Sequence, residues 1–297
     1  MATPITASAP GEVAVGRAAG PSRRRRRWPA VVGRHVALII ASVIFFGPFV
    51  WMILTSLKSN AESTVYPPTI VPAHWMWDNF AQVFTDAPFG QFYFNSVLTS
   101  VLSTAGQVVT SAFAGYAFAR IRFPGRTVLF VVLLGALLVP FQVVFVPLVH
   151  LLSAFHWLNS YQGLIVPNIP SIFGVFLFRQ FFLGFPAELE DAAKIDGCGL
   201  LKRFVLVIAP LSRSVVGAFT ILSFIYNWNN FFYQYIIVNT TRYMTVQLGL
   251  TVFQSQQGNS QFNLLMAAST LAVVPVVIVF LIFQKQIVRG IVLGGLQ

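Results

Sequence analysis

Long apolar runs, separated by short polar stretches, make up most of this 297-residue chain. A helix needs about 20 apolar residues, at about 1.5 Å each, to cross a hydrocarbon core roughly 30 Å thick. Barrel strands would be shorter and would alternate polar with apolar residues. The pattern therefore predicts an all-α polytopic membrane protein, in contact with membrane lipid, with six transmembrane helices. The expected spans are 33–56, 93–118, 127–152, 162–183, 212–237 and 263–284.

Charge supports this interpretation and orients the chain. Only 9% of the residues are charged, against about 25% in soluble domains. Residues 1–32, with the block Arg23–Arg27, predict a disordered basic cytoplasmic tail, followed by a transmembrane domain over 33–297. With that tail inside, only Lys58 and Arg242 of the basic residues fall outside. The net charge of +11 thus follows the positive-inside rule rather than indicating nucleic acid, and both termini are expected in the cytoplasm.

A polar island from Pro186 to Pro210 interrupts the apolar runs on the cytoplasmic side. It holds half of the acidic residues of the chain. Ala187–Lys194 contains no Gly or Pro and predicts a short helix, which the glycines around Cys198 end before a second short helix. We expect a compact two-helix knob in region 184–211 that a partner contacts, although a merely solvated helical loop has the same pattern.

Uncharged polar residues occur in or beside the spans. They are candidates for a path that an uncharged, hydroxylated solute follows, or for hydrogen bonds between neighbouring helices. The candidates are Gln142, Asn168, Asn227 and Asn230. No convincing ionisable residue lies deep in a span, which argues against a proton- or ion-coupled carrier. The energy for transport would then come from elsewhere.

Motifs of catalysis are missing from the sequence. It has no G-x-x-x-x-G-K-[ST] phosphate loop, no H-E-x-x-H zinc helix and no nucleophile elbow. The histidines lack a metal-ligand spacing, and the single cysteine excludes an internal disulfide. We therefore predict no catalytic residue, no metal site and no cofactor in this chain.

The polar island resembles the EAA signature, E-A-A-x3-G-x9-I-x-L-P, of ATP-binding-cassette importer permeases. The spacing matches throughout, with three substitutions that keep charge or apolar character. The matching positions are Asp191, Ala192, Ala193, Gly197, Val207, Ala209 and Pro210. Further phrases resemble the carbohydrate-uptake branch, which includes the maltose and glycerol-phosphate permeases. They are YAFARIRFPGR, GLIVP, IDG and FQKQIVRG.

This resemblance implies a type I, MetI-like permease with cytoplasmic coupling helices in the inner membrane of a bacterium or archaeon. It would pair with a second permease, with two ATPase subunits that bind ATP and Mg, and with an external solute-binding protein, and would import a sugar or polyol by alternating access. The coupling residues implied are Glu188, Glu190, Asp191, Ala192, Ala193, Asp196, Gly197 and Pro210. The docking loop implied comprises Gln254, Ser255, Gln256, Gln257, Gly258 and Asn259. An autonomous channel, a secondary carrier and a membrane enzyme are the alternatives.

Overall fold

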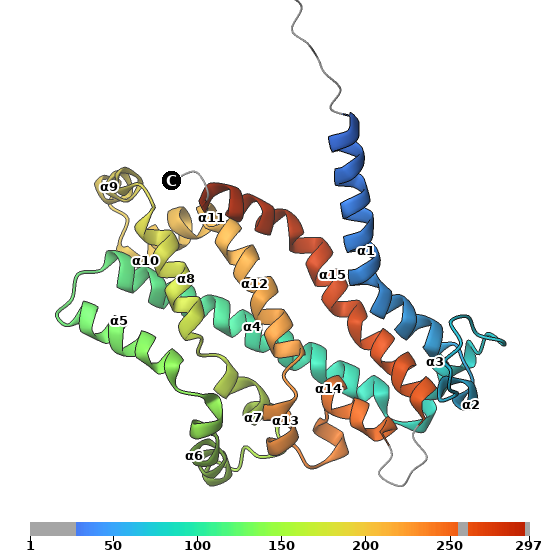
Figure 1. The fold of residues 1–297 in the computed structure, drawn as a ribbon. Coiled ribbons are helices and arrows are strands. Elements are labelled where there is room, and N and C mark those ends of the chain that lie inside the picture. Colours follow the sequence, from blue (N-terminus) through green and yellow to red (C-terminus); the bar gives the residue numbers. More distant parts are fainter. Residues whose placement is uncertain (1–27, 255–260, 295–297) are drawn as a thin grey trace, which may run out of the picture. The chain divides into compact units, whose positions relative to one another are not determined.

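The computed structural model describes residues 28–254 and 261–294, and every regular element in these ranges is a helix (Figure 1). The chain divides into two parts, residues 1–48 and residues 49–297. Helix α1 (Trp28–Ser56) begins in the first part and ends in the second. All other helices belong to the second part, which carries the sites considered below.

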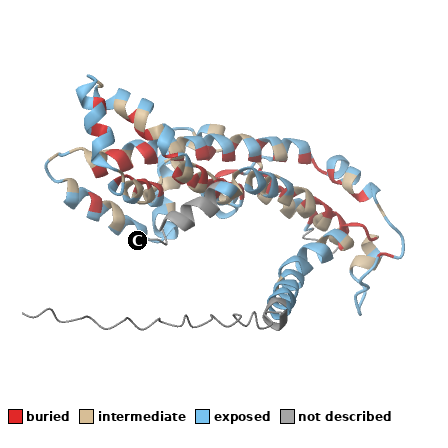
Figure 2. Cartoon of the chain, turned by 90° about the horizontal axis from the view of Figure 1, so that it is seen from above, coloured by how far each residue is buried: buried red, intermediate tan, exposed pale blue. Residues whose placement is uncertain are grey.

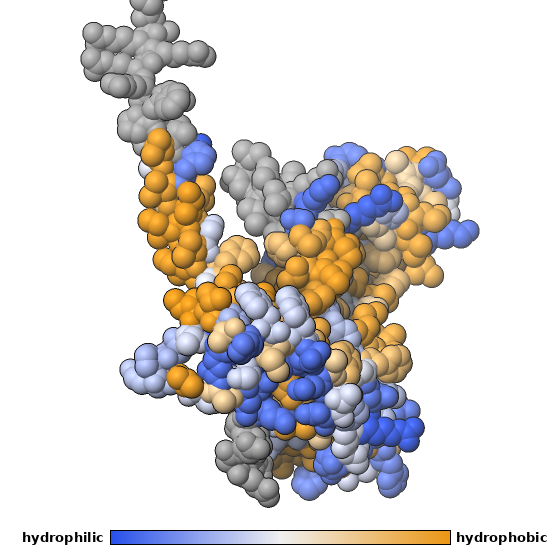
Figure 3. Space-filling view, turned by 90° about the vertical axis from the view of Figure 1, so that its right-hand side faces the viewer, coloured by the Kyte–Doolittle hydropathy of each residue, from blue (hydrophilic) through white to orange (hydrophobic). Residues whose placement is uncertain are grey.

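Apolar side chains of α1 are exposed almost without interruption from Val32 to Val50 (Figure 2). Phe45, for example, is 74% exposed. In the space-filling view these side chains form the orange column at the upper left (Figure 3). A helix that is apolar on every side is stable in lipid rather than in water.

The remaining helices follow one another with short connections. The segment after α1 carries α2 (Asn60–Ser63) and α3 (Asp78–Asp86). The middle of the chain forms α4 (Phe89–Arg120), α5 (Arg126–Gly135), α6 (Phe141–Ala154), α7 (Tyr161–Ile165) and α8 (Ile172–Leu183). The polar island forms α9 (Ala187–Ile195), α10 (Leu200–Arg203) and α11 (Ala209–Leu211). The C-terminal third forms α12 (Arg213–Trp228), α13 (Phe232–Ile237), α14 (Val246–Gly249) and α15 (Phe262–Gly294).

Four helical segments of the described chain are long and apolar enough to cross a membrane. They are Val32–Ser56, Phe89–Arg120, Tyr161–Leu183 and Phe262–Lys285. Two bent pairs raise the number to six if each is one span: Arg126–Leu138 with Phe141–Ala154, and Leu200–Leu211 with Arg213–Trp228. The all-α, polytopic fold predicted from the sequence is thus confirmed.

Three predicted spans are not continuous helices. The expected helix 162–183 divides into α7 and α8, with the turn Val166–Asn168 between them. The expected helix 127–152 bends by 99° between Leu138 and Phe141, because Pro140 has no N–H to donate and keeps the residue before it, Val139, out of the helical conformation. The expected helix 212–237 stops at Trp228. There the side-chain amide of Asn229 donates to the Ile225 carbonyl at 3.0 Å, a local bond that competes with continuation of the helix.

Helix α4 is the element against which most of the second part packs. Its contacts include α8, α12, α14 and α7, and its buried face is a stripe of small and polar residues three or four positions apart. The stripe comprises Asn95, Ser96, Thr99, Ser100, Ser103, Thr104, Gln107, Ser111 and Gly115. A Cβ on Gly115 would lie 2.6 Å from the Cβ of Phe178. Small side chains therefore let α8 approach the α4 backbone closely.

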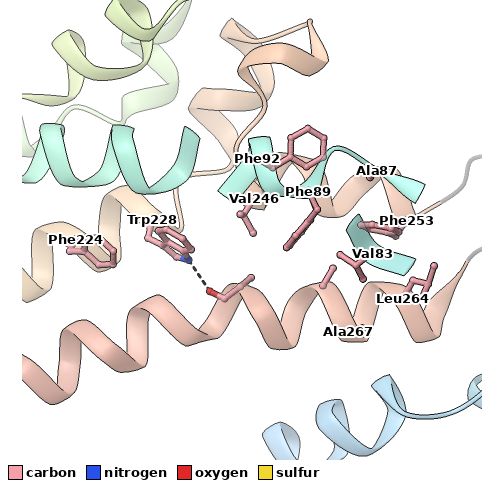
Figure 4. Close-up of a cluster of buried hydrophobic side chains, with 12 residues drawn as sticks. Val83, Ala87, Phe89, Phe92, Phe224, Trp228, Val246, Phe253, Leu264 and Ala267 are labelled. Atoms are coloured by element: carbon pink, nitrogen blue, oxygen red, sulfur yellow. Dashed lines mark hydrogen bonds between the residues drawn. The ribbon is translucent and has the colours of Figure 1, made fainter. Parts of the chain in front are cut away.

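Aromatic side chains form the core at the opposite end of α4 from the polar island (Figures 1 and 4). Phe89 and Phe92 pack against residues of α3, α14 and α15. At the end of α12, Trp228 is 1% exposed and donates its indole N–H to the carbonyl of Ala272 at 3.0 Å. This bond satisfies the only polar atom of a buried indole and fixes α12 to α15.

Replacement of Gly115 by Ala tests the close approach of α4 and α8. The new methyl group would overlap Phe178 and the backbone N of Arg179, at 2.9 Å. We expect a loss of about 1–3 kcal/mol of stability, measured as a lower thermal unfolding temperature in detergent. Gly135→Ala is the matched control, because no atom lies within 4 Å of its added Cβ and Ala favours the helix. An equal effect of both substitutions would refute the proposed crowding.

Candidate coupling surface and transport path

Helix α9 ends in a glycine-dependent turn. Gly197 has a φ of +74°, its N–H donates to the carbonyl of Lys194 at 3.0 Å, and the N–H of Cys198 donates to the carbonyl of Ala193 at 2.9 Å. These two bonds are the pair that defines a Schellman C-cap, in which a left-handed residue follows the helix. The glycine of the predicted signature is thus required by the backbone, and no neighbouring atom lies within 4 Å of its place for a Cβ.

The predicted coupling residues divide between two faces of α9 and the chain after it. Most of them are exposed: Glu188, Asp191, Ala192, Asp196, Gly197 and Pro210. Glu190 and Ala193 are buried, at 7% and 6% exposure. These two side chains are turned toward the body of their own chain, whereas the other six are accessible to a partner. The coupling role of all eight residues stays a prediction.

The carboxylate of Glu190 lies among basic and hydroxyl groups from two other helices. Its Oε1 is 3.2 Å from Nε of Arg120 at the end of α4, and its Oε2 is 3.9 Å from Nη1 of Arg203 in α10. Tyr116 donates its hydroxyl to Oε2 at 3.3 Å. Arg120 also donates from Nη2 to the carbonyl of Phe185, just before α9. The carboxylate therefore joins α9 to both α4 and α10.

Asp191 has a different environment on the exposed side of α9. It pairs with Lys194 at 2.7 Å, one helical turn away. The hydrogen bond and charge of Lys194 hold the pKa of the Asp191 carboxyl below its ordinary value, so the carboxyl stays ionised throughout the physiological range. Since both side chains are more than half exposed, the pair contributes little stability. It leaves an ionised carboxylate beside the small side chain of Ala192, available to a partner.

The chain after the glycine turn contains a π-helical segment. Residues Phe204–Ile208 form it between α10 and α11, and it precedes Pro210. Proline lacks the N–H that would close an α-helical turn, which accounts for the wider local winding. The axis then bends by 79° into α12. The second helix predicted for the knob is therefore present but irregular.

A cavity of about 690 Å³ opens between α4, α8, α12 and the break between α5 and α6. Its lining contains amide, hydroxyl, aromatic and aliphatic groups and no charged side chain. The polar and aromatic lining residues are Gln107, Asn168, Ser171, Ser223, Tyr226, Phe141, Phe173 and Phe219. Such a lining fits a solute with neutral hydroxyl groups.

Three of the four predicted path residues meet in one network around this cavity. Asn227 is buried and donates to Thr104 Oγ1 at 3.1 Å and to Gln107 Oε1 at 3.2 Å. The Gln107 amide in turn donates to the carbonyl of Asn168 at 2.6 Å, and Asn230 donates to Oδ1 of Asn168 at 3.5 Å. Of these three residues only Asn168 lines the cavity. Asn227 and Asn230 form hydrogen bonds to other parts of the chain, which is the second of the two alternatives posed for them.

The fourth path residue, Gln142, is not part of this site. It is exposed and does not line the cavity, whereas its neighbour Phe141 does. Residues that the sequence reasoning missed include Gln107, Ser223 and Tyr226. The signal for Gln107 was present, because it belongs to the polar stripe with helical spacing within the span 93–118.

On the far end of α4, Asn95 fixes the segment before the last span. Its side chain is completely buried and donates to the carbonyls of Arg242 and Met244 at 2.9 and 2.8 Å. It accepts from Gln91 and from the hydroxyl of Tyr161, both at 2.8 Å. All hydrogen-bonding positions of one amide are thus occupied, and the chain at 242–244 is attached to α4 and α7.

The predicted docking loop begins directly after this attached segment. Gln254 is exposed at the end of the turn Leu250–Phe253. The other members of the prediction, Ser255, Gln256, Gln257, Gly258 and Asn259, lie outside the described residues. Their role stays a prediction.

Comparison with known proteins agrees with this arrangement. Residues 107–293 match the family of the binding-protein-dependent transport system inner membrane component. This chain belongs to that family. The match begins at Gln107 and includes the knob and the cavity-lining part of α12. Membership decides against the autonomous channel and the secondary carrier.

Two similar permeases extend the likeness beyond the family region. The chain is 33% identical to the arabinooligosaccharides transport system permease protein AraQ of Bacillus subtilis, over 87% of this chain and 93% of the relative. It is 32% identical to the sn-glycerol-3-phosphate transport system permease protein UgpE of Yersinia enterocolitica, over 87% and 94%. A crystal structure of a bacterial ABC transporter involved in alginate import has the same fold, with a TM-score of 0.77 at 20% identity, covering 89% of this chain and 99% of that one.

Replacement of Asn95 by Leu tests the attachment of the segment before the last span. The substitution leaves the partly buried hydrogen bonds to the carbonyls of Arg242 and Met244 without their donor, and we expect a loss of about 1–3 kcal/mol of stability. The readouts are the thermal unfolding temperature and protease cleavage around residues 241–246. Asn239→Leu is the control, since Asn239 is exposed. Unchanged protease resistance in Asn95→Leu would contradict the anchoring role.

Proposed function

We propose that this chain is a permease subunit through which a neutral sugar or oligosaccharide enters the cell. The observation that carries the proposal is the uncharged cavity beside Gln107, Asn168 and Tyr226. Amide and hydroxyl groups exchange hydrogen bonds with sugar hydroxyls, and the aromatic rings offer apolar faces to sugar C–H groups. Of the solutes named for the two relatives, an arabinooligosaccharide fits such a lining better than glycerol phosphate, whose charge needs a cationic partner.

The proposed complex contains a second permease, two ATPase subunits that bind ATP and Mg, and an external solute-binding protein. ATP-driven closure of the ATPases moves the knob of this chain, and the helices around the cavity alternate between two accessible states. Both termini lie in the cytoplasm in this arrangement. The excess of basic residues on the side of the knob supports that orientation.

The exposed side of α9 is the proposed ATPase contact. Asp191, Ala192 and Gly197 are all exposed there, and the absence of long side chains at the last two positions leaves room for a cleft wall to approach. The ionised Asp191 would pair with a basic group of the ATPase in exchange for Lys194. The proposed docking loop, Gln254 with 255–259, would contact the solute-binding protein on the opposite side.

Substitution of Gly197 by Arg tests the coupling surface. The new side chain would extend into the space that the ATPase is proposed to occupy, so we expect uptake to fall at least about tenfold while membrane insertion persists. Uptake by reconstituted complexes is the measurement. Gly197→Ala separates the cost of the positive φ from the effect of bulk. Gly199→Arg is the matched control, because Gly199 has open space around it and an ordinary φ of −63°. Uptake retained in Gly197→Arg would refute the assignment of the coupling surface.

Substitution of Tyr226 by Ala tests the solute path. Tyr226 is 63% exposed and lines the cavity, so its removal should lower uptake of a neutral oligosaccharide about tenfold without unfolding the chain. Tyr235→Ala is the matched control, because that ring is 61% exposed but does not line the cavity. Uptake of radiolabelled arabinooligosaccharide and glycerol phosphate is compared in the same vesicles. Preferential uptake of glycerol phosphate would refute the neutral substrate class.

A further inference from the structure

Glu190 differs from the other acidic residues of the knob. It is 7% exposed, and the groups around its carboxylate belong to its own chain: Arg120 and Tyr116 of α4 and Arg203 of α10. Glu188 and Asp191, two residues before it and one residue after it, are exposed. A contact with a partner subunit therefore does not explain the placement of Glu190.

The geometry points to Glu190 as a positioning residue that holds α9 rigid on the end of α4, so that movement of the knob turns α4 and reshapes the cavity. This inference rests on the proposed coupling to an ATPase. Three features of α4 and α9 support it.

First, Arg120 fixes α9 at two places. It lies 3.2 Å from the Glu190 carboxylate through Nε, and it donates to the carbonyl of Phe185 through Nη2. Phe185 directly precedes Pro186, the N-cap residue of α9. With Ala193 buried one turn further on, the inner face of α9 has little freedom to move relative to α4.

Second, the same helix α4 reaches the solute path. Thr104 and Gln107 accept the hydrogen bonds of Asn227, and Gln107 donates to the chain at Asn168. Gln107 also lines the cavity. A single uninterrupted helix of 32 residues therefore carries the bonds to the knob at its end and the bonds around the cavity near its middle.

Third, an ion pair is suited to positioning more than to stabilising. Desolvation of buried charges offsets most of their attraction, whereas convergence of several groups on one carboxylate restricts how the helices that carry them can meet. Two arginines and one tyrosine converge on a single carboxylate here. The cluster thus specifies how α9, α10 and α4 meet.

The test is a double-mutant cycle in the complete transporter, reconstituted in liposomes with its ATPase and binding-protein partners. Glu190→Gln, Arg120→Gln and the double variant are compared for the number of substrate molecules imported per ATP hydrolysed. We expect each single substitution to lower this ratio at least about tenfold, and the double variant to resemble the singles instead of multiplying their effects. A role confined to folding would lower the amount of assembled complex and leave the ratio unchanged.

Controls separate this inference from the function on which it rests. Asp86→Asn changes an exposed carboxylate of α3, outside the knob, and should leave the ratio at its wild-type value. If either single variant fails to assemble, Arg120→Met with Glu190→Met removes both charges and replaces the cycle. A wild-type ratio in that pair, or additive effects in the cycle, overturns the positioning role. If Gly197→Arg abolishes uptake while the Glu190 and Arg120 variants keep the wild-type ratio, only the positioning inference has failed. If Gly197→Arg also leaves uptake unchanged, the coupling assignment itself has failed.

Discussion

Close contact along the small-residue stripe of α4 is the constraint on which the rest of the second part depends. In a membrane, lipid tails are as apolar as leucine, so helices gain by packing tightly and by sharing hydrogen bonds, not by withdrawing apolar surface from water. Gly115 and Gly174 allow this approach because a Cβ at either place would overlap Phe178 or Ser111. The polar members of the stripe then bond the backbone between α7 and α8, at Asn168 and Ser171, and the side chain of Asn227.

Interruptions of the apolar helices make the cavity possible. At Pro140 the chain turns sharply between α5 and α6, and residues on both sides of this break line the cavity. Pro167 and Pro170 lie where α7 gives way to α8 and also line it. Non-helical backbone at membrane depth is tolerated where protein or a solvated space surrounds it. The prolines that look unfavourable for a membrane helix thus occur where the structure requires an opening.

Much of the fold followed from hydropathy, and the knob followed from one short run of sequence. Length and apolarity predicted α4 and the apolar span Phe262–Lys285 of α15 within a few residues. The glycines predicted the end of α9, because a left-handed C-cap demands one. The bend at Pro140 and the stop at Trp228 were missed, since hydropathy averages over such local events. The inward direction of Glu190 was also missed, because a charged residue in a polar stretch gives no sign of its partners until Tyr116 and Arg120 are placed beside it.

The length of α4 has a mechanical meaning. Gln107 and Arg120 are separated by about 20 Å along the axis, at about 1.5 Å per residue. If the helix pivots near the cavity as a stiff rod, each degree of tilt moves its end at the knob by about 0.3 Å, by the same geometry. A displacement of the knob by a few ångströms then corresponds to a rotation of roughly ten degrees. The distance that the knob moves and the angle by which α4 tilts are thus related by the separation of Gln107 and Arg120 along this one helix.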